Sequence, residues 1–181
     1  MIPPPETAEY APFYAGYVAK ATEAAAQHNG DLIKAMQAAH RALQELLGSL
    51  NDEQARYRYA PNKWSIKDLV GHLTDAERIF SYRALRFARG DAQELPGFDE
   101  NRYAEQSNAS ERSIHDLLAE FAVVRAGTLA LLKSFTPAMF SRTGVASNHP
   151  ITVRALAYIM AGHEIHHYNV IKERYLIRNM V

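Results

Sequence analysis

The sequence predicts an all-α protein, specifically a four-helix bundle with crossover loops and an extra N-terminal helical segment. Apolar residues recur at intervals of three and four along nearly the whole chain, which is the spacing of one face of an α-helix. Sustained two-residue alternation, which would indicate half-buried strands, is found nowhere. The length of 181 residues suits one domain, so we expect residues 1–181 to form a single bundle domain with its core at about 31–176.

The N-terminal part predicts a short helix followed by the first bundle helix. After a proline-rich start, an aromatic segment interrupted by Pro12 leads into alanine-rich sequence that ends at Gly30. Asp31 is a typical N-cap, and apolar residues recur at three and four from Leu32 to Leu50. We therefore expect a short helix before Gly30 and a bundle helix over residues 31–50.

A long second bundle helix is predicted from about residue 65 to Arg89. Ser65 follows a turn and suits the N-cap, with Asp68 three residues later in the place of a capping-box acid. Gly90 ends the helix. Residues 91–110 show no long apolar period, so they predict an ordered connection with one helical turn. A connection of this length is unusual unless it crosses the bundle or covers a site.

Two further bundle helices are predicted in the C-terminal half. One begins at Ser110 and continues to Pro137, with apolar residues at helical spacing. A loop over 141–150 separates it from the last helix, at about 151–176, which carries three of the eight histidines. Four long helices joined by one or two crossing loops are typical of a four-helix bundle.

The composition excludes several classes of site and partner. The chain has no cysteine, which excludes disulfides, thiolate zinc sites, iron–sulfur clusters and a cysteine nucleophile, so any metal must be held by His, Asp or Glu. Twenty basic and twenty acidic residues give a formal charge of zero, which argues against nucleic acid as a partner. We expect no membrane partner and a cytoplasmic location, because no apolar run approaches the roughly 20 residues that span a bilayer.

Two histidines of the last helix are predicted to face the core together. On a helical wheel the apolar stripe centres about 20° from His163, so His163 and His167 point inward, whereas His166 lies about 80° off the stripe. Imidazoles at positions i and i+4 are about 6 Å apart, a separation that one ion can bridge. Each buried ring needs a partner and resists carrying charge, which favours a metal over two hydrogen-bonded structural histidines.

His72 is the best candidate for a third ligand. It lies about 70° from the centre of its helix's apolar stripe, at the shoulder of the buried face. Gly71 precedes His72 and Gly162 precedes His163, each at a cost of about 1 kcal/mol relative to Ala inside a helix. Either close backbone approach or simple contact between small residues would explain these glycines. The remaining histidines are expected at the surface: His28, His40, His115 and His149.

The same pair of histidines also matches the H-E-x-x-H pattern of zinc proteases, in which Glu164 would be the general base. The third ligand of such proteases normally lies downstream, and only fourteen residues follow His167. No upstream strand that could align a peptide substrate is apparent. A zinc protease is therefore the less favoured interpretation.

The chain resembles the DinB-like family. The resemblance lies in R-Y-A-P-N-K-W-S-I-K-D-L-V-G-H-L at residues 58–73, in segments 77–86, 88–91 and 95–99, and in residues 158–167 followed by E-R-Y at 173–175. It covers about residues 31–176 and implies a four-helix bundle with a divalent metal held by three histidines, one from the second helix and two spaced H-x-x-x-H in the last. In this chain these are His72, His163 and His167.

The resemblance also implies a range of activities. Some members of the family are metal-dependent S-transferases that use low-molecular-weight thiols such as bacillithiol or mycothiol, or are similar to maleylpyruvate isomerase, while many have no known activity. We therefore expect a small-molecule substrate or a thiol co-substrate. Together with the zero net charge and the N-terminal aromatic residues, the resemblance predicts a homodimer formed by helix packing.

Three neutral histidines leave Zn²⁺ or Ni²⁺ with its full charge and at least one open position for water or thiol. Such a site lowers the pKa of a bound water or thiol so that it ionises near neutral pH. The sequence therefore predicts a metal-dependent thiol S-transferase or hydrolase.

Asp75, one turn beyond His72, and Glu164 are candidates for catalytic roles. The competing class is a non-catalytic bundle with a structural metal. Four arginines of the second helix could hold an acidic substrate or pair with surface acids: Arg78, Arg83, Arg86 and Arg89.

Overall fold

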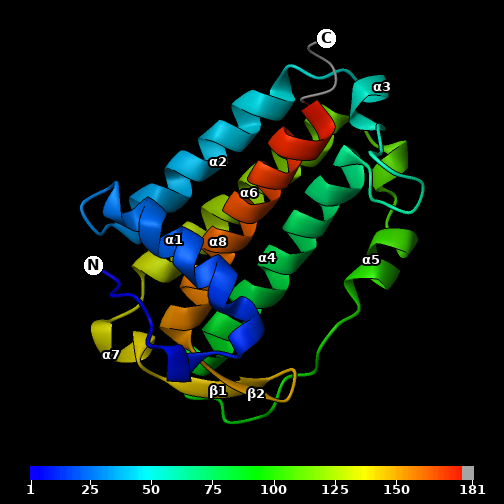
Figure 1. The fold of residues 1–181 in the computed structure, drawn as a ribbon. Coiled ribbons are helices and arrows are strands. Elements are labelled where there is room, and N and C mark those ends of the chain that lie inside the picture. The colour runs from blue at the N-terminus through cyan, green and yellow to red at the C-terminus, as the bar shows by residue number, and fades with distance from the viewer. Residues whose placement is uncertain (177–181) are drawn as a thin grey trace.

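The computed structural model describes residues 1–176 and confirms the helical fold (Figure 1). Its α-helices are α1 (Ala15–Ala26), α2 (Leu32–Gly48), α3 (Asp52–Ala55), α4 (Ile66–Ala88), α5 (Glu100–Gln106), α6 (Ile114–Lys133), α7 (Pro137–Phe140) and α8 (Val153–Val170). Single 3₁₀ turns are found at Thr7–Glu9, Pro12–Tyr14 and Ala109–Glu111, and α8 continues as a π-type segment over Ile171–Leu176. None of the helices described is both long and apolar enough to cross a membrane.

The four long helices form a bundle in which neighbours in sequence are not always neighbours in space. Helices α2 and α4 each pack against both α6 and α8, so α2 faces α4 across the diagonal. The chain therefore crosses the bundle between α2 and α4, and again between α6 and α8. Helix α1 packs along α8 as an additional layer, which confirms the N-terminal helical segment (Figure 1).

The connection over residues 91–110 joins two helices that pack against each other, α4 and α6, so it does not cross the bundle. It contains α5 and extends along the side of α4 (Figure 1). The predicted start of the next helix at Ser110 is wrong by one turn. Ser110 lies in a 3₁₀ turn, and α6 begins after Ser113, whose hydroxyl accepts a hydrogen bond from the Asp116 amide at 3.0 Å.

The predicted loop over residues 141–150 is instead a β-hairpin. Strand β1 (Thr143–Ala146) pairs antiparallel with β2 (His149–Thr152). The two connecting residues, Ser147 and Asn148, both have positive φ, as the tight turns of two-residue hairpins require. Strands of four residues are too short to show a persistent alternation, so the sequence pattern did not reveal them.

A layer of buried polar side chains divides the apolar core into two clusters. One cluster joins α1, the N-terminal half of α2, the C-terminal half of α4 and the hairpin, and the other joins the opposite halves of α2 and α4 to the first turns of α6. Between them lie His40, Glu77, Arg125 and Glu164, one from each long helix. The bundle therefore contains a layer of polar side chains about halfway along its long axis.

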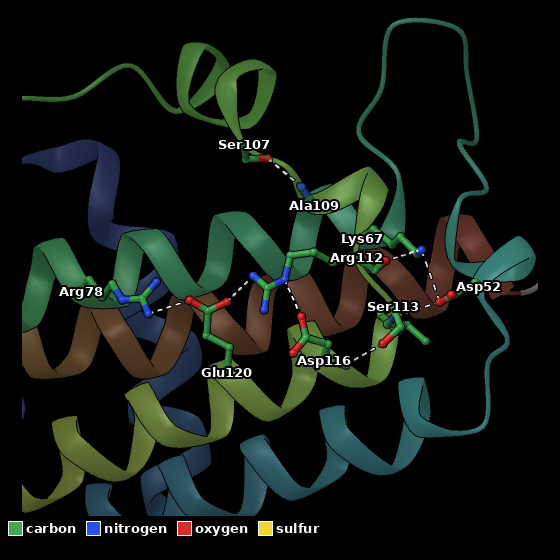
Figure 2. A network of polar contacts seen from close by, with 10 residues as sticks. Asp52, Lys67, Arg78, Ser107, Ala109, Arg112, Ser113, Asp116 and Glu120 are labelled. Atoms are coloured by element: carbon green, nitrogen blue, oxygen red, sulfur yellow. Dashed lines mark hydrogen bonds and ion pairs between the residues drawn. The ribbon is translucent and has the colours of Figure 1, made fainter.

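A chain of ion pairs runs along the outer surface where α4 meets α6 (Figure 2). Arg78 donates to Glu120 at 2.6 Å, Glu120 also pairs with Arg112, and Arg112 donates to Asp116 at 2.6 Å. Exposed pairs of this kind contribute little stability each, about 0–1 kcal/mol. Their importance here is that Arg78 already has an acidic partner.

Candidate metal centre

Helices α4 and α8 bring three histidine side chains to one point. The Nε2 atoms of His72 and His163 are 3.0 Å apart, and those of His167 and His163 are 3.1 Å apart. Helix α4 begins at a capping box, in which Ser65 and Asp68 exchange backbone and side-chain hydrogen bonds, and this fixes the first turn of the helix, one turn before His72. The structure thus brings together the three residues that the sequence singled out.

The arrangement fits a metal ion. Nε2 of His163 has either one hydrogen or one lone pair, so neutral rings cannot satisfy all three nitrogens at once. A cation would accept the three lone pairs together. Nitrogens held at about 2.0–2.1 Å from a tetrahedral ion are about 3.3 Å apart, close to the separations found. Within residues 1–176, this cluster of possible ligand atoms contains only His72, His163 and His167.

Burial keeps the three rings neutral. Loss of solvent lowers the pKa of His72 from 6.5 to about 4 and that of His167 to about 3. The pKa of His163 is also lowered well below 6.5, first by burial and then by repulsion from His167 and His72. At neutral pH all three rings therefore carry free lone pairs, which is the form that binds metal.

The two glycines beside these histidines have different explanations. A Cβ on Gly162 would clash with the backbone carbonyl of Tyr17, so α1 approaches α8 at a distance that only glycine allows. A Cβ on Gly71 would meet the Ala109 methyl at 3.4 Å, an ordinary contact between small residues. Gly162 is thus required by close backbone approach, and this approach places the Tyr17 ring 5.3 Å from the ring of His163.

The histidines line one end of a cavity of about 540 Å³, within the usual range for small-molecule sites. Its walls are largely aromatic: Phe13, Tyr14, Tyr17, Trp64, Phe80 and Phe98. The first three come from the N-terminal segment. Phe98 comes from the connection over residues 91–110, which therefore covers a site, as its length suggested. The Trp64 ring is 4.7 Å from the His72 ring, at the metal end of the cavity.

Neither candidate catalytic carboxylate is among the residues that line this cavity. Glu164 turns away from His163 into the polar layer, where it pairs with Arg125 at 2.8 Å and accepts from His40 Nδ1 at 2.9 Å. Asp75 lies at a separate hollow between α4 and α6, 3.7 Å from Arg78. Burial raises the pKa of Asp75, but its carboxylate does not face the histidines. The H-E-x-x-H interpretation therefore lacks its general base.

The expectation that His40 lies at the surface is wrong. Its side chain is 13% exposed and packs against Phe121, with ring centroids 4.9 Å apart. The signal was present, because residue 40 continues the apolar stripe of Met36 and Leu43 at intervals of four and three. His115 and His149 are exposed, as predicted, and His28 is partly exposed.

The sequence interpretation also missed the ion pairs at the centre of the polar layer. Arg125 donates through Nε and Nη2 to both oxygens of Glu77, each at 2.6 Å, and both side chains are almost fully buried. Arg125 follows Phe121 by four residues on the core face of α6, so an arginine in an apolar stripe was the available signal. This ion pair links α4 to α6 behind the histidines.

The sequence profile of the DinB superfamily matches residues 35–171. A protein of Geobacillus kaustophilus named "putative metal-dependent hydrolase" is 31% identical over 129 residues, which are 69% of this chain and 71% of that protein. A protein of Oceanobacillus iheyensis with the same description is 28% identical over 132 residues, 72% of this chain and 75% of that protein.

A solved structure shares the fold. YfiT from Bacillus subtilis, described as a probable metal-dependent hydrolase with an unusual four-helix bundle topology, superposes with a TM-score of 0.70. The match covers 82% of this chain and 85% of YfiT at 22% sequence identity. The aromatic residues that the N-terminal segment contributes to the cavity lie outside the part matched by the superfamily profile.

Proposed function

This chain belongs to the DinB superfamily, and we propose that it is a metal-dependent enzyme in which His72, His163 and His167 hold one divalent ion. The observation that carries the proposal is the convergence of three neutral imidazole nitrogens at the wall of a cavity, with no fourth protein ligand beside them in the described residues. Structural zinc sites are closed by a fourth protein ligand, whereas catalytic sites keep a position open. Zinc and nickel both suit imidazole donors.

We propose hydrolysis of a small molecule as the reaction. A divalent ion with an open position lowers the pKa of a water or thiol ligand, and so supplies a nucleophile at neutral pH. The neutral histidines leave the charge of the ion undiminished. The aromatic walls present apolar surface to a bound molecule, so electrostatic interactions beside them are stronger than in bulk water. Burial raises the pKa of Tyr14 and Tyr17, so both phenols stay protonated and can donate hydrogen bonds to a substrate.

Transfer of an external thiol would use the same site. Since the chain has no cysteine, the sulfur nucleophile would have to come from a low-molecular-weight thiol bound as a second substrate. The names of the relatives from Geobacillus and Oceanobacillus support hydrolysis as the first choice.

The test uses protein purified without an affinity tag, stripped with a chelator and reloaded with zinc or nickel. It is assayed against a panel of small esters and amides in water, and against an electrophilic chlorodinitroarene with added cysteine or glutathione. Turnover of an ester or amide that requires the metal supports the hydrolase. Turnover that requires both metal and thiol supports the transferase. Full metal occupancy without either activity favours a structural metal and contradicts the proposed catalysis.

We also propose a homodimer formed by helix packing. Static light scattering checks the mass of the particle directly. A monomeric mass at protein concentrations of roughly tens of micromolar would contradict the proposed dimer.

A further inference from the structure

Arg83 on α4 is a buried cation without an acidic partner. Its side chain and backbone together are 3% exposed, and it forms no ion pair with a carboxylate in the described part of the chain. Arg78 and Arg86 on the same helix pair with Glu120 and Asp91, respectively. An unpaired buried charge is costly, so a function is expected for it.

The contacts of Arg83 are with neutral acceptors and hold the guanidinium in place. Nη2 donates to the carbonyl oxygen of Pro96 at 2.7 Å and to Oγ of Ser147 at 3.1 Å. The first acceptor belongs to the connection after α4, and the second to the turn of the β-hairpin. The Tyr14 hydroxyl lies beside the same guanidinium. A guanidinium has five N–H donors, and the contacts with Pro96 and Ser147 use the two on Nη2. The donors on Nε and Nη1 therefore remain for the Tyr14 hydroxyl and for a ligand, and the positive charge is not neutralised.

The position of Arg83 relative to the histidines defines two ends of one cavity. Arg83 and His72 are eleven residues apart on α4, which is about three turns and about 16 Å along the helix axis. They therefore lie on one face of the helix. Ala76 and Phe80 lie between them on that face, and all four line the cavity. The cavity thus has the histidines at one end, the guanidinium towards the other and an apolar wall between.

We propose that Arg83 binds the anionic group of the substrate, a small organic acid with an apolar or aromatic body. The opposite end of the substrate would carry the bond that reacts at the histidines, and this part of the assignment rests on the proposed function. A carboxylate and a phosphate share the chemistry that a guanidinium recognises, since both are anions that accept charge-assisted N–H bonds, here from Nε or Nη1. The exposed carboxylate of Glu100 also lines the cavity, which favours a substrate with one anionic group over a polyanion.

The experiment measures binding of three probes with the same phenylalkyl body: a carboxylate, its primary amide and a phosphonate. Calorimetry gives the affinities for the wild-type chain, and the fluorescence of Trp64, the single tryptophan, reports entry into the cavity. We expect an anionic probe to bind at least about tenfold more tightly than the amide, as a hydrogen-bonded charge pair implies. The stronger of the two anions identifies the substrate group. Equal affinity of all three probes would overturn the proposal.

Three variants separate the charge of Arg83 from its structural contacts. Arg83→Gln is expected to reduce the preference for the anion to about one, and Arg83→Lys to retain part of it. Arg78→Gln is the matched control, because it removes an arginine from the same helix that already pairs with Glu120 (Figure 2), and it should keep the full preference. Thermal unfolding of each variant monitors the fold. A full preference in Arg83→Gln would contradict the assignment.

Repeating the titration after chelation distinguishes this proposal from the proposed function. Retention of the anion preference without metal supports Arg83 as the binding group. Loss of the preference on chelation would assign the anion to the metal and would overturn the role of Arg83, while leaving the metal site intact. Conversely, a chain that binds no metal but still prefers the anion would refute the proposed enzyme and keep the role of Arg83.

Discussion

The Nε2 atoms of His72 and His163 lie 3.0 Å apart although 91 positions separate them in the chain. Their meeting depends on the packing of α4 against α8, and behind them the ion pair of Glu77 with Arg125 holds α4 against α6. The histidines therefore occupy a position fixed by the tertiary structure. Preorganisation of this kind allows a site to bind metal without being required for folding.

Metal removal should leave the protein folded. The two apolar clusters are built without the histidines, so chelation removes ligand binding but not the core. With free metal at 100 times its dissociation constant, bound metal stabilises the folded state by about 2.7 kcal/mol. Losing it should lower the melting temperature of a chain of this size by about 5–10 °C. Circular dichroism before and after chelation measures both the helical signal and the shift. Loss of the helical signal at 25 °C would contradict this expectation.

Substitution of Gly162 should disrupt the packing of α1 on α8. In Gly162→Ala the added methyl group meets the carbonyl of Tyr17, so we expect a loss of about 2–4 kcal/mol in the free energy of unfolding. Gly127→Ala in α6 is the control, because an added methyl there meets nothing within 4 Å. It should stabilise the chain by about 0.5–1 kcal/mol. Urea unfolding of both variants tests the contrast, and equal effects would show that the close approach is unimportant.

The contact between Glu9 and Arg154 should make stability depend on pH. Hydrogen bonding to Arg154 is the main cause that lowers the pKa of Glu9 from 4.5 to about 2. The folded protein therefore keeps this carboxylate charged where the unfolded chain takes up a proton. The stabilisation is fully present above about pH 4.5 and is lost as the pH falls towards 2.

Glu9→Gln isolates this contribution. At pH 7 the variant should lose about 1–3 kcal/mol in the free energy of unfolding, the usual contribution of hydrogen bonds to a charged group. Near pH 2 the difference from the wild type should shrink, because Glu9 itself is then partly protonated. Unfolding curves at both pH values measure this. A difference that is constant with pH would show that the carboxylate charge has no role in anchoring the N-terminal segment.

Glu164 should prove structural. In Glu164→Gln the hydrogen bond to His40 can be kept, while the charge that faces Arg125 is removed. Since Arg125 retains Glu77, we expect a loss of about 1–3 kcal/mol, with the metal content per chain unchanged. Metal analysis and unfolding on one preparation check both. A variant that is fully metal-loaded and stable, yet inactive on a substrate the wild type hydrolyses, would restore the protease-like role.

Periodicity predicted the long helices and the shared face of His163 and His167 because both depend on local geometry. The inclusion of His72 came from the wheel position together with the family resemblance, and the structure brings it to the other two. Metal binding by this set stays a prediction. His40 was misplaced because its residue type was given more weight than its position on the apolar stripe.

The rest of the site depends on contacts that no local pattern encodes. The aromatic side chains of residues 13–17 reach the cavity only because α1 lies on α8. Arg83 differs from Arg78 and Arg86 because the connection after α4 and the hairpin turn fold over it. In the sequence these arginines look equivalent. Their separation into one buried cation and surface ion pairs follows from tertiary structure alone.

The most direct test of the metal centre is the metal content of tag-free protein, measured by inductively coupled plasma mass spectrometry. We predict one divalent ion per wild-type chain and a sharp loss of occupancy in each of His72→Ala, His163→Ala and His167→Ala. His166→Ala is the matched control, because His166 lies on the same helix but outside the cluster of three, and it should remain fully loaded. Equal loss on substitution of His166, or full occupancy without His72, would contradict the three-histidine site.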